Sequence, residues 1–563
     1  MSEEQKKLHG LARKWALWNA IKFKGKANPN AVLGKILQEM PAIKDDVKSA
    51  MPAILSVVKE VNALSLAEQE EAFSSMDTKN ISSVVGIKKE RGLFYGLVED
   101  NEKVVTAFPP EPSKYPHIGH AKAILLNHGL AKEYDGTFIL RFEDTNPALA
   151  KKEFYGIHLE NYAWLGIIPD KVQYASDHMD LFLASARKLA EEKTAYVCTC
   201  SQDEIKAHRF RGEACDHVES GASVEAFENF LHAPEGSAIL RLHIDMKHKN
   251  SAMRDPAIMR IMETPHCRTG TKYRIWPTYD FENSIMDGHT GITHRLRSKE
   301  FELRNELQRH IQSLFGFTPT KITEFARFNM EGVESSGRKI RELIEQGKLS
   351  GWDDPSLTTL VALRRRGFQP QAIRDFVLST GITKAESVLT WHDLEVQNRR
   401  ILDEKAERYF FIRDPVKIRI VGAPEKIVEL KKHPSENLGT RRFRTGESFF
   451  LTSDDVARIE EDKLYRLMDL LNFKKKGDAY SFVSDGVDDY RKQGTSIFHW
   501  LPDDGKLVET AVLMPDHQTV TGLAESGVAD LKEGSVIQFE RFGFVRLDAR
   551  DAQKGFSFWF THK

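Results

Sequence analysis

The chain has 563 residues, of which 41% are hydrophobic and 29% charged, and its formal net charge is −1. This length predicts several domains, about three to five, and the composition is typical of globular protein rather than of disordered or fibrous chains. The near-neutral charge excludes a general attraction to nucleic acid, so an RNA partner would need local basic patches.

Three features of the sequence bear on its location. The sequence contains no run of about 18 apolar residues, so no membrane span is predicted. The N-terminal Met-Ser-Glu-Glu-Gln-Lys-Lys lacks the apolar segment of a signal peptide. Four cysteines, three of them clustered, suit a reducing compartment better than a disulfide framework. We therefore expect a cytoplasmic protein that does not interact with membranes.

Residues 1–75 predict a bundle of short helices, an N-terminal helical extension. Apolar residues recur there at spacings of three and four, at Leu8, Leu11, Trp15 and Trp18 and again at Ile54, Val58, Val61 and Leu64. The basic stretch Lys22–Lys26 predicts a solvated turn. Residues 76–100 predict a linker that leads into the next domain.

A strand, a turn and a helix are predicted between residues 104 and 130. The helical pattern begins after Pro116, with His-Ile-Gly-His in its first turn. Helix N-termini carry unpaired N–H groups and partial positive charge, which favour phosphate. Gly119 permits close backbone approach, and His117 and His120 flank it as donors. The turn therefore suits a triphosphate cradle; the alternative is a helix start that carries two histidines.

A second predicted strand, Thr137–Phe142, is followed directly by Glu143 and Asp144. Ligands of open parallel sheets bind beyond the carboxyl ends of the strands, where a carboxylate suits a substrate ammonium group or a ribose hydroxyl. The alternative is a helix N-cap formed by Asp144 or Thr145.

Two segments around these elements carry a family resemblance. Phe-Pro-Pro-Glu-Pro precedes the histidines at residues 108–112, and Leu-Arg-Phe-Glu-Asp-Thr-Asn-Pro follows them at 140–147. Together they closely resemble class I aminoacyl-tRNA synthetases of the glutamyl and glutaminyl group, whose class signature would be His117–His120. The resemblance implies two sets of site residues, catalytic His117, Gly119 and His120 and ATP-binding Glu111, Pro112 and Lys122.

The resemblance also implies an α/β multidomain fold. We expect a Rossmann-type catalytic domain with an insert, a helical subdomain, C-terminal β-barrels and an N-terminal extension similar to that of archaeal glutamyl enzymes. The expected boundaries are 101–195 and 291–345 for the two halves of the catalytic domain, 196–290 for the inserted acceptor-stem domain, 346–407 for the helical subdomain and 408–563 for the anticodon-binding barrels.

The expected insert contains a cluster of metal-ligand residue types. Cys198-Thr-Cys200 is followed by fourteen residues and then by Cys215-Asp-His217. Three thiolates and an imidazole are enough for a closed tetrahedral zinc site, although the first step is tighter than usual and buried cysteines without metal are the alternative. Some glutamyl-tRNA synthetases are similar in carrying a zinc element with this kind of spacing. The lone Cys267 is expected to be an ordinary thiol.

Four residues are expected, from the resemblance, to bind the amino acid: Glu143, Tyr279, Arg297 and Ile322. Glu143 would face the α-amino group, and Tyr279 would bond the substrate side chain, unless it is a half-buried strand tyrosine. Glutaminyl enzymes have a small uncharged residue in place of Arg297 and an amide in place of Ile322. Because a guanidinium pairs bidentately with a carboxylate, both positions favour glutamate. Ser298, Phe328 and Asn329 are expected to complete the ATP pocket, since 323–329 resembles the family's adenine region.

Residues 334–340, Glu-Ser-Ser-Gly-Arg-Lys-Ile, stand where the family has its second signature, a loop that grips the outer phosphates of ATP. We call this stretch the signature loop. Ser336 fits the pattern, but Gly337 occupies the place of the key lysine. Arg338 and Lys339 follow at once, so either they supply the charge or the loop acts more weakly. Ala107 is a second departure, because many relatives have an arginine there that contacts the substrate carboxylate.

The remaining chain predicts RNA-binding parts. An arginine triplet at 364–366 would face RNA phosphate or solvent, and Arg364 and Arg365 are candidates for tRNA binding. Beyond residue 408, alternating patterns predict strands, notably at 416–421, 449–451 and 536–547, and short strands with Gly and Asp turns indicate barrels. A β-rich C-terminus resembles archaeal and eukaryotic glutamyl enzymes more than bacterial ones. Its basic candidates are Arg408, Arg441, Arg442, Arg444 and Lys474–Lys476, with Arg408 the expected tRNA contact.

These features together predict a glutamate–tRNA ligase of the archaeal type. It would use ATP with Mg²⁺ to form glutamyl-adenylate and would transfer the glutamyl group to the 3′ end of tRNA(Glu), with Zn²⁺ as a structural metal. The sequence leaves open whether tRNA(Gln) is also charged, and it leaves the oligomeric state open. The alternatives are a glutaminyl-tRNA synthetase, which Arg297 and Ile322 argue against, and a catalytically lapsed RNA-binding relative, which Ala107 and Gly337 keep open.

Overall fold

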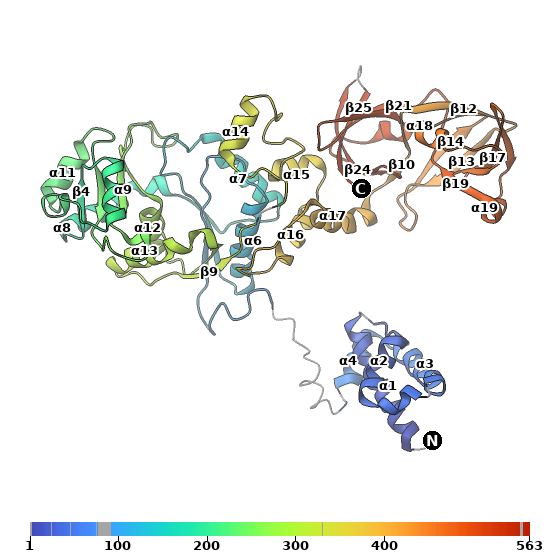
Figure 1. Cartoon of the computed structure of the whole chain (residues 1–563), viewed down its shortest axis with the longest axis horizontal. Helices are drawn as coiled ribbons and strands as arrows, with labels where there is room; N and C mark the ends of the chain where they lie inside the picture. The colour runs from blue at the N-terminus through green and yellow to red at the C-terminus, as the bar shows by residue number, and fades with distance from the viewer. Residues whose placement is uncertain are drawn as a thin grey trace. The chain divides into compact units, whose positions relative to one another are not determined.

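The computed structural model describes residues 3–23, 25–45, 47–74, 76, 92–328, 330–551 and 555–563. The chain forms two compact units, Met1–Gly92 and Leu93–Lys563 (Figure 1). Most of the expected linker falls on residues 77–91, outside the described part of the chain. Among the described helices, none is both long enough and apolar enough to cross a bilayer.

The first unit is a helical bundle. Its α-helices in the described residues are α1 Glu3–Lys22, α2 Pro29–Glu39, α3 Val47–Asn62 and α4 Leu66–Ser74. Trp15, Ile36 and Ile54 are buried at its centre, because residues spaced by three or four share one helix face. The Asn28 side chain caps α2, whose first residue is Pro29. The helices predicted for this region are confirmed.

A five-stranded parallel sheet lies in the N-terminal half of the second unit, in the order β3-β2-β1-β8-β9. Its strands are β1 Val105–Phe108, β2 Thr137–Phe142, β3 Lys171–Tyr174, β8 His294–Ser298 and β9 Lys321–Phe325. β1 pairs with β2 on one side and β8 on the other, so the strand order reverses at β1. Such a switch point opens a crevice at the carboxyl ends of the strands. The expected Rossmann-type sheet is confirmed.

Helix α6, Ile118–Glu133, connects β1 to β2 and is held firmly on the sheet. Its residues Ile124 and Leu125 pack with Phe138 of β2 in one core. The buried Asn127 side chain donates to the Leu296 carbonyl oxygen (2.7 Å) and accepts from the Leu296 amide (3.0 Å). These bonds hold α6 against β8. The other helices around the sheet are α7 Lys152–Trp164, α12 Tyr279–Thr290 and α13 Glu302–Leu314.

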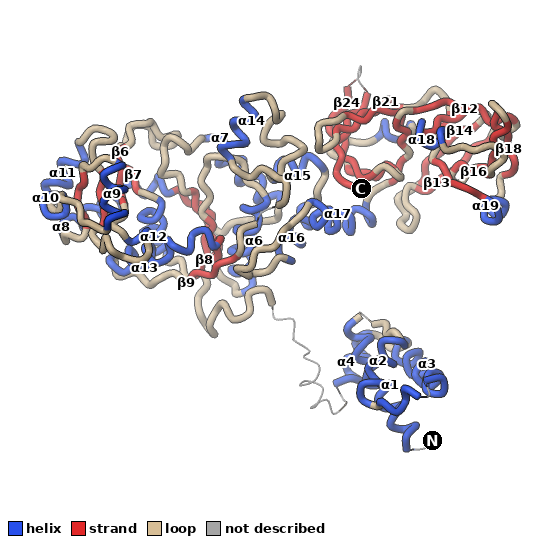
Figure 2. Tube along the Cα trace, in the orientation of Figure 1, coloured by secondary structure: helices blue, strands red, loops and turns tan. Residues whose placement is uncertain are grey.

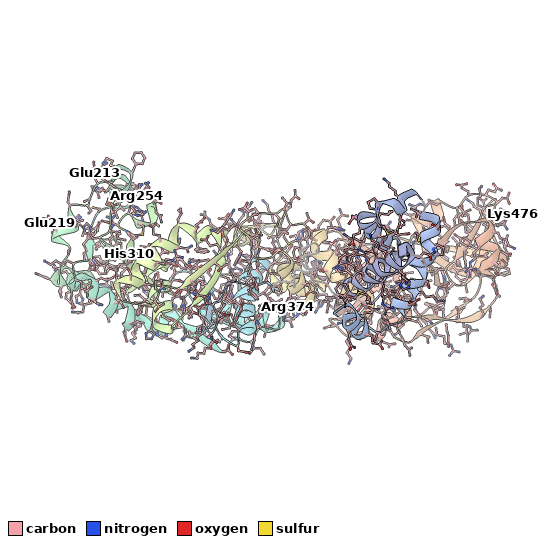
Figure 3. The ribbon with its side chains drawn as sticks, turned by 90° about the horizontal axis from the view of Figure 1, so that it is seen from below. Glu213, Glu219, Arg254, His310, Arg374 and Lys476 are labelled. Atoms are coloured by element: carbon pink, nitrogen blue, oxygen red, sulfur yellow. The ribbon has the colours of Figure 1, made fainter. Side chains whose placement is uncertain are left out.

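The inserted region contains a four-stranded antiparallel sheet, in the order β4-β5-β6-β7. Its elements are β4 Ala195–Cys198, β5 Ile239–Leu242, β6 Ala257–Ile261 and β7 Ile275–Pro277, with α8 Met179–Glu191, α9 Gln202–Arg211, α10 His217–Ser220 and α11 Val224–His232. The strand predicted at 238–245 is shorter than expected, because the Ile244 amide bonds the Asp255 carboxylate (2.8 Å) instead of a strand. Arg254, labelled in Figure 3, donates to the carbonyl oxygens of His248 and Arg209 and so ties the loop before β6 to α9.

Four helices and then two barrel-like sheets complete the chain (Figure 2). The helices are α14 Gly337–Glu345, α15 Leu360–Arg366, α16 Pro370–Ser379 and α17 Trp391–Lys405. The first sheet consists of β10 Arg408–Tyr409, β23 Val536–Phe539, β24 Gly543–Asp551, β25 Gly555–His562, β21 Val508–Leu513, β22 Thr519–Ala524 and β11 Phe411–Arg413. The second consists of β19 Gly494–Phe498, β16 Leu464–Leu467, β17 Leu471–Lys476, β18 Ala479–Ser484, β12 Pro415–Val421, β15 Ser448–Thr452 and β20 Leu501–Pro502. The hairpin of β13 Lys426–Lys431 and β14 Thr440–Thr445 and the short helices α18 Ser453–Ala457 and α19 Val487–Gln493 accompany them.

The strand predicted at 536–547 is two strands. Arg541 has a φ of 63°, which extended backbone does not allow. The Phe542 amide donates to the Phe539 carbonyl oxygen (2.9 Å) and closes a turn. β23 and β24 therefore form an antiparallel hairpin, in which Val536 pairs with Arg546.

Residues 352–366, which we call the bridging segment, contact both α6 and the first C-terminal sheet. We call α6 the signature helix, because its first turn contains His117–His120. At one end the Ile118 amide donates to the Thr358 carbonyl oxygen (3.0 Å). At the other end the Arg366 guanidinium donates to the carbonyl oxygens of Phe560 and Thr561 in β25, and also to that of Pro355. Arg366 is only 2% exposed, so the third arginine of the triplet faces neither solvent nor RNA.

We expect Arg366→Met to lower the stability of the second unit by at least about 2 kcal/mol. The substitution keeps the apolar stem but leaves three buried carbonyl oxygens without their donor. The midpoint of urea unfolding, followed by tryptophan fluorescence, measures the change. Arg364→Met is the matched control: Arg364 forms an exposed pair with Glu160 (2.7 Å), a kind of pair that contributes at most about 1 kcal/mol. Equal midpoints for the two variants would contradict this account.

Candidate active site

The first turn of α6 holds the two signature histidines in a fixed geometry. His117 is the N-cap: its Nδ1 accepts from the Gly119 amide (3.0 Å), and its own amide donates to Nδ1 of His120 (3.1 Å). A Cβ at Gly119 would lie 2.8 Å from Cε1 of His117, so the turn requires glycine. Because both Nδ1 atoms accept, the protons are assigned to the Nε2 atoms. Each ring therefore offers an Nε2–H donor.

Both imidazoles are neutral at physiological pH. Burial lowers the pKa of His117 to about 3, with the charges of Lys114 and Arg327 contributing. Burial also lowers the pKa of His120 well below its usual range, with His117 and Lys114 contributing. Two neutral N–H donors at a helix N-terminus suit the binding of an oxyanion rather than proton transfer.

A buried cluster of charges occupies the ends of β2 and β8 next to α12. Asp287 accepts from the Arg141 guanidinium (2.8 Å) and also from that of Arg295, so one carboxylate is shared by two cations. Glu143 lies 3.5 Å from Arg141 and accepts from Asn283. Burial raises the pKa of Glu143 to about 7, against the opposing charges of Arg141 and Arg295.

The residues after Glu143 do not cap a helix, so the N-cap alternative is wrong. The Asp144 carboxylate accepts from the Ser176 amide (2.7 Å) and from the Tyr155 hydroxyl (2.8 Å). The Thr145 hydroxyl bonds Glu282. The next helix, α7, begins seven positions later, with Lys151 as its N-cap.

Arg297 is a buried cation that has only neutral partners in the described part of the chain. Its guanidinium donates to the Tyr279 hydroxyl (2.6 Å), to Gln308 (2.7 Å) and to Asn305 (3.2 Å). It is 5% exposed, and no described carboxylate oxygen lies within 4 Å of it. A buried charge without a counter-ion is costly, and a bound anion would offset that cost.

The other two amino-acid candidates lie around Arg297. Tyr279 is the first residue of α12 and not a strand residue, because the Glu282 amide already bonds the Thr278 carbonyl oxygen (2.9 Å). Burial raises the pKa of Tyr279 to about 12; since its oxygen accepts from Arg297, its own proton is available to a ligand. Ile322 pairs in register with Arg295, two positions before the partner of Arg297, and so shares that face of the sheet.

Lys122 lies on α6 without a hydrogen-bond partner among the described residues. It is 3% exposed, and its ammonium stands over the rings of Phe325 (5.1 Å) and Phe328 (5.7 Å). Burial lowers the pKa of Lys122 to about 8.

The other candidates for ATP binding are engaged in local hydrogen bonds. Glu111 accepts from the Ser113 hydroxyl (2.7 Å), and the Pro112 carbonyl oxygen accepts from the Lys151 amide (3.0 Å). Ser298 donates to Glu300 (3.3 Å). Asn329 lies outside the described residues.

The signature loop leads into α14, and Ser336 is the N-cap of that helix. Both candidate cations of the loop are engaged elsewhere: Arg338 pairs with Glu342 (2.9 Å), and Lys339 pairs with Glu334 (2.8 Å). Their side chains are 87% and 64% exposed. Neither is in contact with the signature histidines in this conformation.

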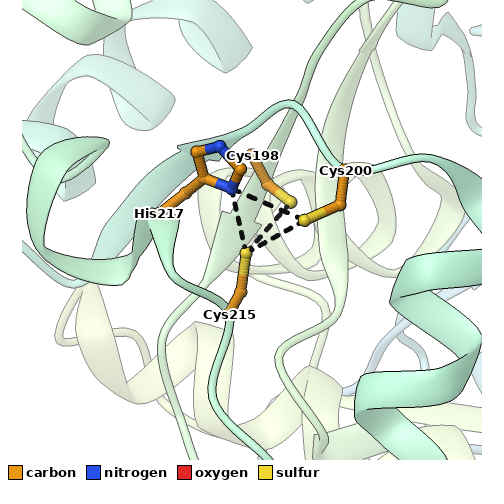
Figure 4. Close-up of side chains that lie close together, drawn as sticks. All are labelled: Cys198, Cys200, Cys215 and His217. Carbon is orange, nitrogen blue, oxygen red and sulfur yellow. Dashed lines mark hydrogen bonds between the residues drawn. The ribbon is translucent and has the colours of Figure 1, made fainter.

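The predicted metal-ligand cluster comes together in space (Figure 4). Cys215 Sγ lies 3.5 Å from Cys198 Sγ, 3.3 Å from Cys200 Sγ and 3.2 Å from Nδ1 of His217. Sulfurs bound to one tetrahedral zinc at about 2.3 Å each lie roughly 3.7 Å apart, so little movement is needed. Nε2 of His217 is hydrogen-bonded to the Thr199 hydroxyl (2.8 Å), the kind of outer contact that orients a metal-binding imidazole.

Sequence reasoning did not single out several residues of this site. Arg141 interrupts the apolar run of β2, and a charge inside a buried strand is the signal that could have indicated it. Asp287 and Asn283 lie on one face of α12 at a spacing of four, which the sequence alone does not distinguish from a solvated face. Lys114, whose charge contributes to lowering the pKa of both histidines, gave no signal.

Comparison with known proteins matches the chain to one family over most of its length. The catalytic domain of the class I tRNA synthetases (E and Q) matches residues 103–404, and two anticodon-binding domains of that group match residues 406–484 and 497–548. The chain is 39% identical to a glutamate–tRNA ligase of Pyrococcus furiosus, over 97% of this chain and 98% of that protein. It is 37% identical to a glutamate–tRNA ligase of Methanothermobacter thermautotrophicus, over 98% and 99%. The chain belongs to the class I tRNA synthetases of the E and Q group.

One solved structure is also similar to part of this chain. The glutamate tRNA ligase of Elizabethkingia meningosepticum has a TM-score of 0.41 and 17% identity, over 54% of this chain and 70% of that one.

In this synthetase the anticodon-binding matches fall on the two C-terminal sheets. Arg408 lines a hollow of about 440 Å³ whose walls come from both sheets, together with Arg466 and Arg541. Arg441 is instead buried and paired with Glu525 (2.8 Å), so it joins the β13–β14 hairpin to the first C-terminal sheet rather than facing solvent. The other basic candidates Arg442, Arg444 and Lys476 are exposed, and Lys476 is labelled at the end of β17 in Figure 3.

The remaining tRNA candidates lie on α15. Arg364 is exposed and pairs with Glu160 (2.7 Å). Arg365 donates to Asp548 (2.7 Å) and Asp353 (2.6 Å) and stacks on Trp559 at 4.1 Å. Arg365 therefore joins the bridging segment to the first C-terminal sheet, and its charge is already balanced.

We expect the Lys122→Met variant to be more stable than the wild type at pH 7. We expect this difference in stability to shrink as the pH rises. The folded lysine has a pKa of about 8 and the unfolded lysine one of about 10.4. Below pH 8 the folded protein carries a buried charge at a cost, and between those two values the unfolded state binds more protons, so wild-type stability rises. Urea unfolding at pH 7, 8, 9 and 10 should show that the free energies of unfolding of the variant and the wild type converge.

Lys132→Met, on an exposed position at the end of the same helix, should show no such trend. A stability difference for Lys122→Met that is absent at pH 7, or that widens with pH, would mean that the ammonium has a partner or is solvated.

Proposed function

We propose that this synthetase is a glutamate–tRNA ligase. The α-carboxylate of glutamate attacks the α-phosphate of ATP to give glutamyl-adenylate and pyrophosphate, and the 3′ end of tRNA(Glu) then takes the glutamyl group. The observation that carries the proposal is Arg297, a buried guanidinium whose described partners are all neutral. A side-chain carboxylate balances that charge, whereas the amide of glutamine leaves it uncompensated.

The amino acid binds between β2, α12 and β8. Arg297 and the Tyr279 hydroxyl bind the γ-carboxylate, and Ile322 offers no amide partner for a glutamine side chain. Glu143 faces the α-ammonium group; its neighbour Asn283 keeps the carboxylate oriented. Three cations, Arg141, Arg295 and Arg297, face two carboxylates, Asp287 and Glu143. This excess of one positive charge favours a substrate with two carboxylates and one ammonium group.

ATP binds over the first turn of α6. The Nε2–H groups of His117 and His120 stabilise the negative charge that develops on the α-phosphate, and Gly119 allows the backbone to approach it. Lys122 and Phe328 line the nucleotide pocket, with Glu111, Pro112 and Ser298 at its edges. Asn329, outside the described residues, is proposed as a further ATP contact. Ser336 orders the start of α14, and Arg338 and Lys339 exchange their present carboxylates for the outer phosphates. Mg²⁺ accompanies the ATP and offsets part of its charge.

The tRNA contacts are proposed at Arg408 for the anticodon end and at Arg364 and Arg365 along the inner side, where bound phosphate would compete with Glu160, Asp353 and Asp548. The N-terminal bundle of residues 1–75 is a further appendage to the catalytic, inserted, helical and barrel regions outlined from the sequence. The free thiols of all four cysteines suit a reducing compartment such as the cytoplasm.

The experiment that tests the proposal is ATP–pyrophosphate exchange, measured with glutamate or glutamine and with or without tRNA. We expect exchange that depends on glutamate and on tRNA(Glu), with tRNA(Gln) assayed in parallel for charging with glutamate. Exchange with glutamine alone would favour a glutaminyl enzyme. No exchange with either amino acid would favour an RNA-binding relative that has lost catalysis.

We expect Arg297→Ala to lose two to four decades in kcat/KM for glutamate. Removing one partner of a buried charge pair costs about 3–5 kcal/mol, and about 1.4 kcal/mol corresponds to a factor of ten. Glutamine is neutral and should lose far less, so the ratio of the two kcat/KM values is the informative measurement. Arg309→Ala, at an exposed position of α13, is the control. An unchanged ratio would place the discriminating cation elsewhere.

We further propose that Cys198, Cys200, Cys215 and His217 hold one structural zinc ion. Their four ligand atoms lie within 4.8 Å of one another. Protein purified without chelator should contain about one zinc per chain, and Cys200→Ser should reduce that content sharply. Cys267→Ser, outside the cluster, should keep it. Zinc content near zero in the wild type, with activity insensitive to a strong chelator, would rule the site out.

A further inference from the structure

The first turn of α6, which contains His117 and His120, has no positively charged side chain. Both imidazoles are neutral, as shown above, and the partial charge of a helix N-terminus amounts to only about half an elementary charge. A triphosphate brings several negative charges. Cations from elsewhere in the chain must therefore complete the site, and the two on the signature loop are exposed and paired with Glu342 and Glu334.

Lys114 and Arg341 are two cations near this turn that have no carboxylate oxygen within 4 Å in the described ranges. Lys114 is half-buried and lies three residues before His117. Arg341, in α14, reaches back to the carbonyl oxygen of Ser113 (3.4 Å). Burial lowers the pKa of Lys114, and the charges of Arg341 and Arg327 lower it further, against the opposing Glu111 and Glu300. Like charges held together in this way are relieved by a bound anion.

The position of Lys114 is fixed by its surroundings. Its carbonyl oxygen accepts from Nε2 of His158 (2.9 Å), a buried residue of α7. Its aliphatic stem crosses Gly337: a Cβ added at Gly337 would lie 2.6 Å from Cδ of Lys114. Because Gly337 has no side chain, the stem of Lys114 can pass over it.

We propose that Lys114, together with Arg341, binds the pyrophosphate portion of ATP and supplies the charge that the signature loop lacks at Gly337. The inference rests on the proposed function and adds two phosphate-binding residues to it. A cation that is held in place before the reaction stabilises charge developing on phosphate without reorganisation. Arg338 and Lys339 then contribute only after the loop has moved.

The test is ATP–pyrophosphate exchange with glutamate and tRNA(Glu), on the full-length protein, for Lys114→Met and Arg341→Met. We expect kcat/KM for ATP to fall about 100-fold for Lys114→Met, with KM for glutamate changed less than about twofold. The KM for pyrophosphate in the exchange should rise at least about tenfold, whereas inhibition by AMP should change little, because AMP lacks the phosphates that the two cations bind. A merely structural defect would weaken the binding of pyrophosphate and of AMP together.

Three further variants sharpen the result. Lys114→Arg keeps the charge and should retain most activity, and Lys132→Met, an exposed lysine of α6 outside the site, should behave as wild type. Gly337→Ala removes no charge but displaces the lysine stem, so it should reproduce part of the Lys114→Met defect, and it tests the proposal if Lys114→Met does not fold. Wild-type kinetics in both Lys114→Met and Arg341→Met, with activity lost in the Arg338→Ala/Lys339→Ala double variant, would overturn the inference. Absence of exchange in the wild type would instead refute the proposed function.

Discussion

The site depends on one imbalance of charge at the end of a parallel sheet. Asp287 is one carboxylate shared by Arg141 and Arg295, and Arg297, two positions further along β8, donates only to hydroxyl and amide oxygens among the described residues. Apolar packing of α6 and α12 on the strands keeps water out, so these charges interact strongly and cannot be screened by solvent. Within the described part of the chain, the protein therefore leaves the buried positive charge of Arg297 without a carboxylate partner.

Much of this arrangement could be predicted from the sequence because it is local. The spacing of apolar residues located β1, β2 and α6, and the turn chemistry at Pro116 placed His117 at the start of a helix. The errors came where distant groups compete for the backbone or the side chain. Asp255 ends β5 early, a left-handed residue at Arg541 splits one expected strand into a hairpin, and Ser176 and Tyr155 take the carboxylate of Asp144.

The charged residues show the same limit more sharply. Arg364, Arg365 and Arg366 are adjacent in sequence, yet one is exposed, one bridges two carboxylates and one is buried against carbonyl oxygens. Arg441 looked like its neighbours Arg442 and Arg444 but is enclosed by Glu525 and Glu540. Sequence identifies which residues carry charge, whereas the counter-ion that each one meets is decided by tertiary contacts of high sequence separation.

The bridging segment connects the catalytic part to the C-terminal part, although the family domains divide the chain between them. Residues 352–366 hold the Ile118 amide through Thr358, and they also hold the last strand through Arg366 and His517 through Asp354. A catalytic fragment ending after α17 would keep the segment but lose β25 and His517, exposing a buried guanidinium and a buried carboxylate to water beside the signature helix. The catalytic and C-terminal parts are therefore not interchangeable modules, and a chimera that exchanges the C-terminal sheets must carry matching partners for this segment.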